Sequence, residues 1–169
     1  MTEPMQIVIL EDNADRRRVM LDCLRDRFPQ YEVLFFRSAS EMVGHLQRHL
    51  GRVLAISLDH DLEPADPRSP EAADPGTGRD VANFLATRRP TCPVVIHSSN
   101  TFGTLGMKDV LDETHWPTYV VTPFDDTAWI AESWFPTVRR AIVDSIREVS
   151  SPASVSQPPV ESPASQVAG

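Results

Sequence analysis

The stretch Met5-Gln6-Ile7-Val8-Ile9-Leu10-Glu11-Asp12-Asn13 decides the fold class. Residues 5–10 are almost all apolar, which is typical of a strand that is buried on both faces. Sheets covered on both faces occur mainly where parallel strands alternate with helices. Asn13 can cap such a helix directly after the strand, because apolar side chains then recur at every fourth position, at Met20, Leu24 and Phe28.

The same alternation continues along the chain. Short apolar and β-branched runs predict further strands at 31–36, 53–58, 93–97 and 118–122. Ser38 and Glu41 predict a capping box for the second helix, and Pro136 predicts a kink or a break in the last one. Five strands alternating with five helices indicate an α/β fold, a parallel sheet with right-handed crossovers and helices on both faces. The helices are expected to bury Met42, Val43, Leu46 and Leu50, then Val81, Phe84 and Leu85, and finally Ile130, Trp134, Val138, Ile142 and Ile146.

The length of 169 residues fits one domain with a short appendage. We predict a folded domain over residues 1–149 and a disordered tail over residues 150–169. The tail is rich in Ser, Pro and Ala, with Ser-Pro-Ala-Ser at 151–154 and again at 162–165. Such a segment has too little apolar surface to offset the entropy of ordering it. A protein partner for the tail remains unknown at this stage.

Charge and composition exclude several classes of protein. The formal net charge of −8 argues against nonspecific nucleic-acid binding as the main role. No apolar run reaches the roughly 18 residues that a membrane-spanning helix needs, and the acidic start before the first strand does not read as a signal peptide. The two cysteines, Cys23 and Cys92, lie far apart, which favours a reducing cytoplasm over a disulfide framework.

Polar residues follow four of the predicted strands. In a parallel α/β sheet the carboxyl ends of the strands meet at one edge, where binding sites form. Taken singly, these residues have simpler explanations, because acidic residues cap helices and a lone histidine at a strand end is commonly structural. Their convergence favours a site, since packed carboxylates repel each other unless a cation lies among them. The four segments are Glu11-Asp12-Asn13, Asp59-His60-Asp61, His97-Ser98-Ser99-Asn100 and Thr122-Pro123-Phe124-Asp125-Asp126.

Glu11, Asp12 and Asp59 predict an oxygen-rich cradle for Mg²⁺ or Mn²⁺. If the strand geometry continues past Asp59, then Asp59 and Asp61 point to one side and His60 to the other. His60 and His97 are candidate general acids or bases.

The Gly76-Thr77-Gly78 loop precedes a helix, and its backbone N–H groups can approach an anion, although taken alone the loop is better explained as a turn with an N-cap. The residues expected to bind substrate are Thr77, Gly78, Ser98, Ser99, Asn100 and Asp125.

Together these segments resemble a response-regulator receiver domain. Glu11-Asp12 resembles the acidic pair after the first strand, and Asp59 the phosphoacceptor aspartate. The resemblance covers residues 5 to about 148 and implies a flavodoxin-like, doubly wound sheet with strand order 2-1-3-4-5. Receivers carry a lysine where this chain has Thr122, and Lys108 lies before the fifth strand and is not a positional substitute.

The departures from ordinary receivers resemble one divergent branch, the cyclic-phosphate-processing receiver domain. The shared motifs are Leu-Glu-Asp-Asn at 10–13, Ser-Leu-Asp-His-Asp-Leu at 57–62, Gly-Thr-Gly at 76–78, Ile-His-Ser-Ser-Asn at 96–100 and Pro-Phe-Asp-Asp at 123–126. The resemblance implies a metal-assisted phosphoesterase that processes a cyclic phosphate on a nucleotide or an RNA end.

In that enzyme, Asp59 or Asp61 would orient water, and His97, with His60 as the alternative, would protonate the departing ribose oxygen. Two other functions stay open. One is an atypical receiver that is phosphorylated on Asp59, and the other is a non-catalytic pseudo-receiver that binds a protein. The missing lysine argues against ordinary receiver switching, because that cation stabilises phosphoryl oxygens.

Overall fold

The computed structural model describes residues 4–66, 68–69 and 72–150. In this part of the chain a five-stranded parallel sheet has the order β2-β1-β3-β4-β5, which confirms the predicted flavodoxin-like topology. Every strand lies within its predicted range. The strands are β1 (Gln6–Leu10), β2 (Glu32–Phe36), β3 (Val53–Leu58), β4 (Val94–His97) and β5 (Thr118–Val121). The helices are α1 (Ala14–Arg27), α2 (Ala39–His49), η1 (Leu50–Arg52), α3 (Gly78–Ala86), α4 (Thr101–Glu113), η2 (Ile130–Trp134) and α5 (Phe135–Ser150).

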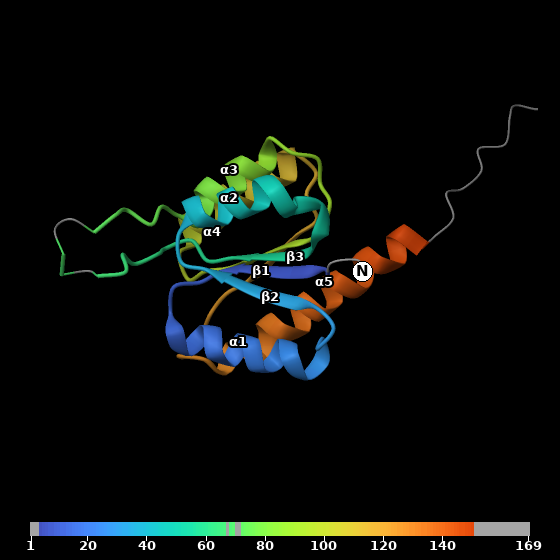
Figure 1. The fold of residues 1–169 in the computed structure, drawn as a ribbon, viewed down its shortest axis with the longest axis horizontal. Helices are drawn as coiled ribbons and strands as arrows, with labels where there is room; N and C mark the ends of the chain where they lie inside the picture. The colour runs from blue at the N-terminus through green and yellow to red at the C-terminus, as the bar shows by residue number, and fades with distance from the viewer. Residues whose placement is uncertain (1–3, 67, 70–71, 151–169) are drawn as a thin grey trace, which may run out of the picture.

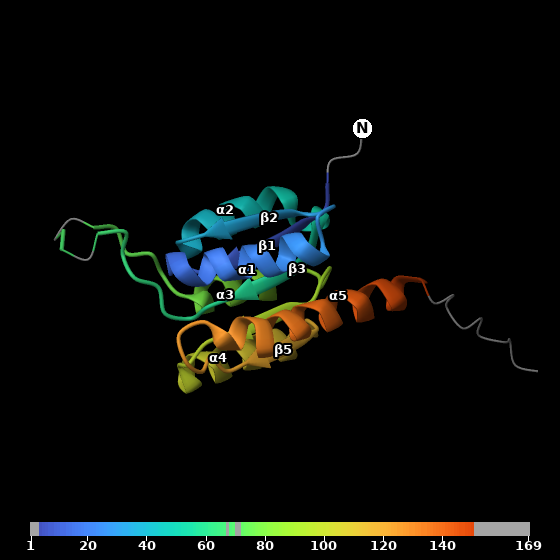
Figure 2. The same cartoon turned by 90° about the horizontal axis from the view of Figure 1, so that it is seen from below.

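Two helical layers enclose the sheet. Helices α2, α3 and α4 cover one face, and α1 and α5 cover the other (Figures 1 and 2). Successive residues of β1 alternate between the layers, so that Val8 and Leu10 join the core under α2–α4 while Ile7 and Ile9 join the core under α1 and α5. This is the physical reason for the unbroken apolar run that opens the chain.

The break predicted at Pro136 is present as a change of helix type. The turn η2 is π-helical, and the N–H of Phe135 donates to the carbonyl of Ile130. Pro136, the second residue of α5, has no N–H to donate to the preceding turn, and the change of helix type lies directly before it. Trp129, just before this π-helical turn, and Trp134, at its end, are both completely buried against the sheet.

The far end of α5 differs from the prediction. Ile146 was expected in the core but is 45% exposed, because α5 runs beyond the edge of the sheet (Figure 2). The helix extends to Ser150, and the rest of the expected tail lies outside the described residues. No helix in the described ranges is long and apolar enough to cross a membrane.

The connection between β3 and α3 leads away from the carboxyl edge of the sheet and returns to it (Figure 1). It closes at its base through an antiparallel bridge between Asp61 and Thr77 and a 3.0 Å hydrogen bond from the N–H of Gly78 to the carbonyl of His60. Gly78 needs to be glycine because a Cβ there would lie 2.1 Å from the carbonyl oxygen of Asp59. The loop is therefore clamped directly against the end of β3.

This clamp gives a stability prediction with an internal control. Gly78→Ala should lower the free energy of unfolding by several kcal/mol, because backbone must move to admit the new methyl group. Gly44→Ala, in α2, where a Cβ would meet nothing within 4 Å, should raise stability by about 0.5–1 kcal/mol through helix propensity. Urea denaturation of both variants tests this, and equal stability changes would contradict the clamp.

Candidate functional site

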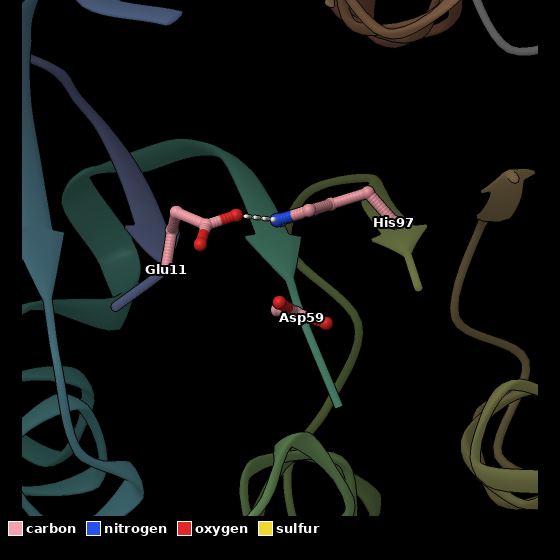
Figure 3. A group of neighbouring side chains, drawn as sticks. All are labelled: Glu11, Asp59 and His97. Atoms are coloured by element: carbon pink, nitrogen blue, oxygen red, sulfur yellow. Dashed lines mark hydrogen bonds and ion pairs between the residues drawn. The ribbon is translucent and has the colours of Figure 1, made fainter. Parts of the chain in front are cut away.

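A buried carboxylate and a buried histidine face each other at the carboxyl edge of the sheet. Glu11 follows β1 and His97 ends β4, and Glu11 Oε2 lies 3.3 Å from His97 Nε2. Neither side chain is exposed at all. Asp59, which follows β3 between these strands, lies beside the pair (Figure 3). One ligand atom from each of the three residues fits within 4.8 Å of the others.

A chain of hydrogen bonds fixes the orientation of His97. Trp134 Nε1 donates to Ser57 Oγ over 2.9 Å, and Ser57 Oγ lies 2.8 Å from His97 Nδ1. When Ser57 donates to Nδ1, the Nε2–H of His97 donates to Glu11. The imidazole also stacks on Trp129, with ring centroids 5.8 Å apart. Both of its nitrogens are therefore engaged inside the protein.

The environments of Glu11 and Asp59 push their pKa values in opposite directions. Burial raises the pKa of Glu11, but the hydrogen bond and charge of His97, the N–H of Asn13 and the charge of Arg16 outweigh it and leave the pKa below its ordinary value. Burial is the main cause that raises the pKa of Asp59 to about 6, with repulsion from Glu11 added to it. The negative charge of the buried Asp59 carboxylate is thus only partly compensated by its surroundings.

Arg16 is the site residue that the sequence analysis missed. From the first turn of α1, its guanidinium lies 3.6 Å from Asp59 Oδ2 and 3.8 Å from Glu11 Oε2, and 5.7 Å from the centre of the Trp129 ring. These ion pairs are longer than hydrogen bonds, so they leave its N–H groups available. Arg16 therefore places a positive charge beside both carboxylates. The signal was the position of Arg16 three residues after the capping Asn13.

Asp12 lies near Asp59 but not in the buried group. Its Oδ2 accepts the N–H of Glu63 over 2.6 Å, and it does not cap α1, since Asn13 accepts the N–H groups of residues 15 and 16. Asp12 and Asp59 both line an open pocket of about 400 Å³. Arg16, Arg37, Asp61 and the loop residues 62–65 complete its walls.

A second histidine–carboxylate pair follows β3, and its carboxylate, Asp61, lines this pocket, whereas His60 is not among the lining residues. His60 Nδ1 lies 2.7 Å from Asp61 Oδ1, and Asn100 Nδ2 donates to both oxygens of Asp61 over 3.2 and 3.0 Å. These hydrogen bonds, that of Asn100 first, lower the pKa of Asp61. The His60 ring packs closely on Gly103, where an added Cβ would lie 2.4 Å from it.

The expected alternation past Asp59 is wrong, although Asp59 and Asp61 do line the same pocket. Strand β3 ends at Leu58, so the next three residues do not follow strand geometry. His60 turns toward Asp61 instead of away from it.

The Gly76-Thr77-Gly78 loop has a structural role. Each of its N–H groups is bonded within the protein, that of Gly76 to Asp74, that of Thr77 to Asp80 and that of Gly78 to His60. Thr77 and Asp80 form a capping box for α3. The loop therefore presents none of these N–H groups to an anion, contrary to the substrate-binding role expected for Thr77 and Gly78.

The remaining predicted site residues, Ser98, Ser99, Asn100 and Asp125, do not line this pocket. Asn100 caps α4 by accepting the N–H of Gly103, and Ser98 is buried and accepts the N–H of Asn100. Ser99 is exposed. Asp125 is exposed, has a left-handed φ of 57° and is not among the residues that line the pocket.

Comparison with known proteins places this geometry in a family. The family model described as "Cyclic-phosphate processing Receiver domain" matches residues 9–113, more than half of the chain. The chain belongs to this family. It is therefore a receiver domain of the response-regulator superfamily, as the five sequence motifs indicated. No curated protein matches the chain significantly.

Solved receiver structures share its fold. A CheY-like receiver domain from Methanospirillum hungatei has 13% identity and a TM-score of 0.60, covering 86% of this chain and 99% of that one. The phosphorylated cyanobacterial phytochrome response regulator RcpA has 19% identity and a TM-score of 0.58, covering 89% and 98%. The Mn²⁺-bound form of response regulator Rcp1 has 18% identity and a TM-score of 0.56, covering 92% and 100%.

The raised pKa of Asp59 predicts a specific pH dependence. Between the ordinary value of 3.8 and about 6 the folded state binds more protons at Asp59 than the unfolded state does, so this group lowers stability as pH rises through that range. Asp59→Asn, which mimics the protonated form, should be more stable than wild type above pH 7 by up to about 3 kcal/mol. That advantage should vanish as pH falls toward 4. Urea denaturation in EDTA measures it, and a pH-independent difference would contradict the assignment.

Proposed function

We propose that this receiver domain is a metal-assisted phosphoesterase that opens a cyclic phosphate on a nucleotide or an RNA end. The observation that carries the proposal is the His60–Asp61–Asn100 arrangement, in which Asp61 lines the pocket of Asp59 and Arg16 and hydrogen-bonds His60 and Asn100. A carboxylate that orients an imidazole is a common acid–base device, and here it adjoins groups suited to a cation and to phosphate oxygens. An ordinary phosphoacceptor site has no need of an oriented histidine.

The donor set fits a divalent cation. Asp59 is 6% exposed and only partly compensated by Arg16, and such a carboxylate gains most from a hard cation. Asp59 and Asp12 would hold Mg²⁺ or Mn²⁺ at the pocket, with Glu11 behind them. When bound, the cation would supply positive charge to phosphate oxygens and to an attacking water.

The residues of the chain account for the proton movements. Asp61 keeps the Nδ1–H of His60 toward itself, so Nε2 is the atom that exchanges protons. Water forms a new bond to phosphorus and gives up its proton to solvent or to a carboxylate of the pocket. The bond between phosphorus and one ribose oxygen breaks, and the imidazolium form of His60 protonates that oxygen. The product is a phosphomonoester with a free hydroxyl, and Arg16 balances the charge on its oxygens.

His97 serves this proposal as a positioning residue. The sequence analysis preferred it as the general acid, but it is completely buried and both nitrogens are engaged, by Ser57 and Glu11. Its proposed role is to hold Glu11 ionised behind Asp59. His60, the alternative in the sequence analysis, is the acid that the geometry supports best.

A pair of conservative variants separates the two histidines. His60→Gln should lower kcat about 10²–10⁴-fold on a cyclic phosphate with little change in Tm. His97→Gln should lose several kcal/mol of stability, because it disturbs a buried charged pair. Turnover of 2′,3′- and 3′,5′-cyclic nucleotides with Mg²⁺, with Mn²⁺ and with EDTA, together with Tm, provides both readouts.

His115→Asn is the control, since His115 lies in a turn after α4 and Asn tolerates its left-handed φ of 63°. Full activity of His60→Gln would remove His60 from the mechanism. If wild type opens no cyclic phosphate with either metal, the non-catalytic pseudo-receiver becomes the better description.

Phosphorylation of Asp59 is the second candidate function, because Asp59 follows β3 as the phosphoacceptor does in receivers. Its side chain is only 8% exposed, and Thr122 stands in place of the receiver lysine. We therefore expect little incorporation from acetyl phosphate with Mg²⁺. Intact-protein mass spectrometry measures this, with Asp59→Asn as the blank. Stable phosphorylation that the blank lacks would favour signalling over catalysis.

A further inference from the structure

A second hollow adjoins the pocket of Asp59. It is a groove of about 530 Å³ between the start of α2 and the described residues of the β3–α3 connection. Arg37, Glu63 and Ala65 line both hollows, so the two adjoin at these residues. The size of the groove lies within the roughly 300–1,000 Å³ typical of small-molecule sites. Nothing in the chemistry assigned above uses it.

Arg37 stands where the two hollows meet. It directly follows β2, at the same edge of the sheet as Glu11 and Asp59, and it is exposed. Among the described residues its guanidinium has neither an ion pair nor a hydrogen bond. Arg16 lines the same pocket as Arg37, and guanidinium groups are well suited to binding phosphate oxygens.

Beyond Arg37 the groove becomes acidic. Glu41, Glu63, Asp66 and Asp74 line it, against Arg37 as the single basic residue. A ligand that extends from Arg37 into this groove therefore meets the negative charge of these carboxylates. Unscreened like charges repel within a Debye length of about 8 Å at physiological salt, so a second phosphate among these carboxylates would be repelled, whereas neutral sugar and base atoms would not be. Carboxylates also accept hydrogen bonds from sugar hydroxyls and base amino groups.

We propose that the groove binds the nucleoside of a mononucleoside cyclic phosphate, and that its acidic wall excludes polynucleotide ends. Arg16 and Arg37 hold the one phosphate at the junction, and the ribose and base lie between α2 and the loop. The proposal rests on the proposed function for the placement of the phosphate. It narrows the substrate from a nucleotide or an RNA end to the free nucleotide.

Binding tests this separately from catalysis. The probes are adenosine 2′,3′-cyclic phosphate and a short oligoribonucleotide that ends in the same 2′,3′-cyclic phosphate. Titration calorimetry with the His60→Gln variant in Mg²⁺ avoids loss of the probe by turnover. The mononucleotide should bind at least about 10-fold more tightly than the oligonucleotide, and added salt should shrink the difference because it is electrostatic.

Two variants in this background locate the effect. Arg37→Ala should weaken mononucleotide binding about 10-fold, whereas Arg89→Ala, an equal charge change after the end of α3, should not. The double variant Glu63→Gln/Asp66→Asn should leave mononucleotide binding within about 3-fold and strengthen oligonucleotide binding, since it removes only repulsion. Unchanged discrimination in the double variant would overturn the role of the acidic wall.

The outcomes separate the two proposals. If the mononucleotide binds as expected but wild type opens no cyclic phosphate, the substrate assignment stands and the catalytic proposal fails. If wild type opens both probes and binds them equally, the catalytic proposal stands and this inference is wrong. If neither probe binds, this inference is also wrong, whatever the activity on other cyclic phosphates.

Discussion

The buried pairing of Glu11 with His97 is the interaction on which the rest of the site depends. A carboxylate with no exposure to solvent is stable as an anion only if hydrogen-bond donors and positive charge surround it. His97 meets this need from the end of β4, two strands from β1 in the sheet order. Its orientation in turn requires Ser57 on β3 and Trp134 in η2. The π-helical turn thus brings a tryptophan from the last helical segment to the centre of the site.

The two aspartates after β3 show how environment divides similar groups between roles. Asp59 lies in the interior, where burial raises its pKa to about 6. A bound cation or positively charged ligand would stabilise its ionised form. Asp61 lies at the rim, where Asn100 and His60 lower its pKa and tie it to an imidazole. Groups whose pKa values are driven apart are typical of sites that combine electrostatic stabilisation with proton transfer.

The positively charged side chains near Asp59 come from different elements than in the receiver pattern. Thr122 follows β5 where receivers carry a lysine, and Lys108 is paired with Asp112 on the surface of α4. Arg16 approaches Asp59 from α1, and Arg37 stands after β2 at the same edge. An arginine presents a planar fork to phosphate oxygens, unlike the single charge of a lysine. Under the proposed function, these two arginines would hold the phosphate of a ligand.

Local sequence patterns were sufficient for the strands, their parallel arrangement and the edge at which the polar residues meet. The apolar run of β1, the capping residues Asn13 and Ser38 and the helical periodicity are short-range features, and the helices obey them. The strand order and the motifs implied by the resemblance then predicted that Glu11, Asp59 and His97 lie at the same edge of the sheet. The orientation of individual side chains was not accessible in this way. His60 turns toward Asp61 because β3 ends at Leu58, His97 is enclosed by two tryptophans of a distant helical segment, and Arg16 reaches Asp59 by packing of α1 on the sheet. Those outcomes depend on contacts between residues far apart in the chain, which no local pattern encodes.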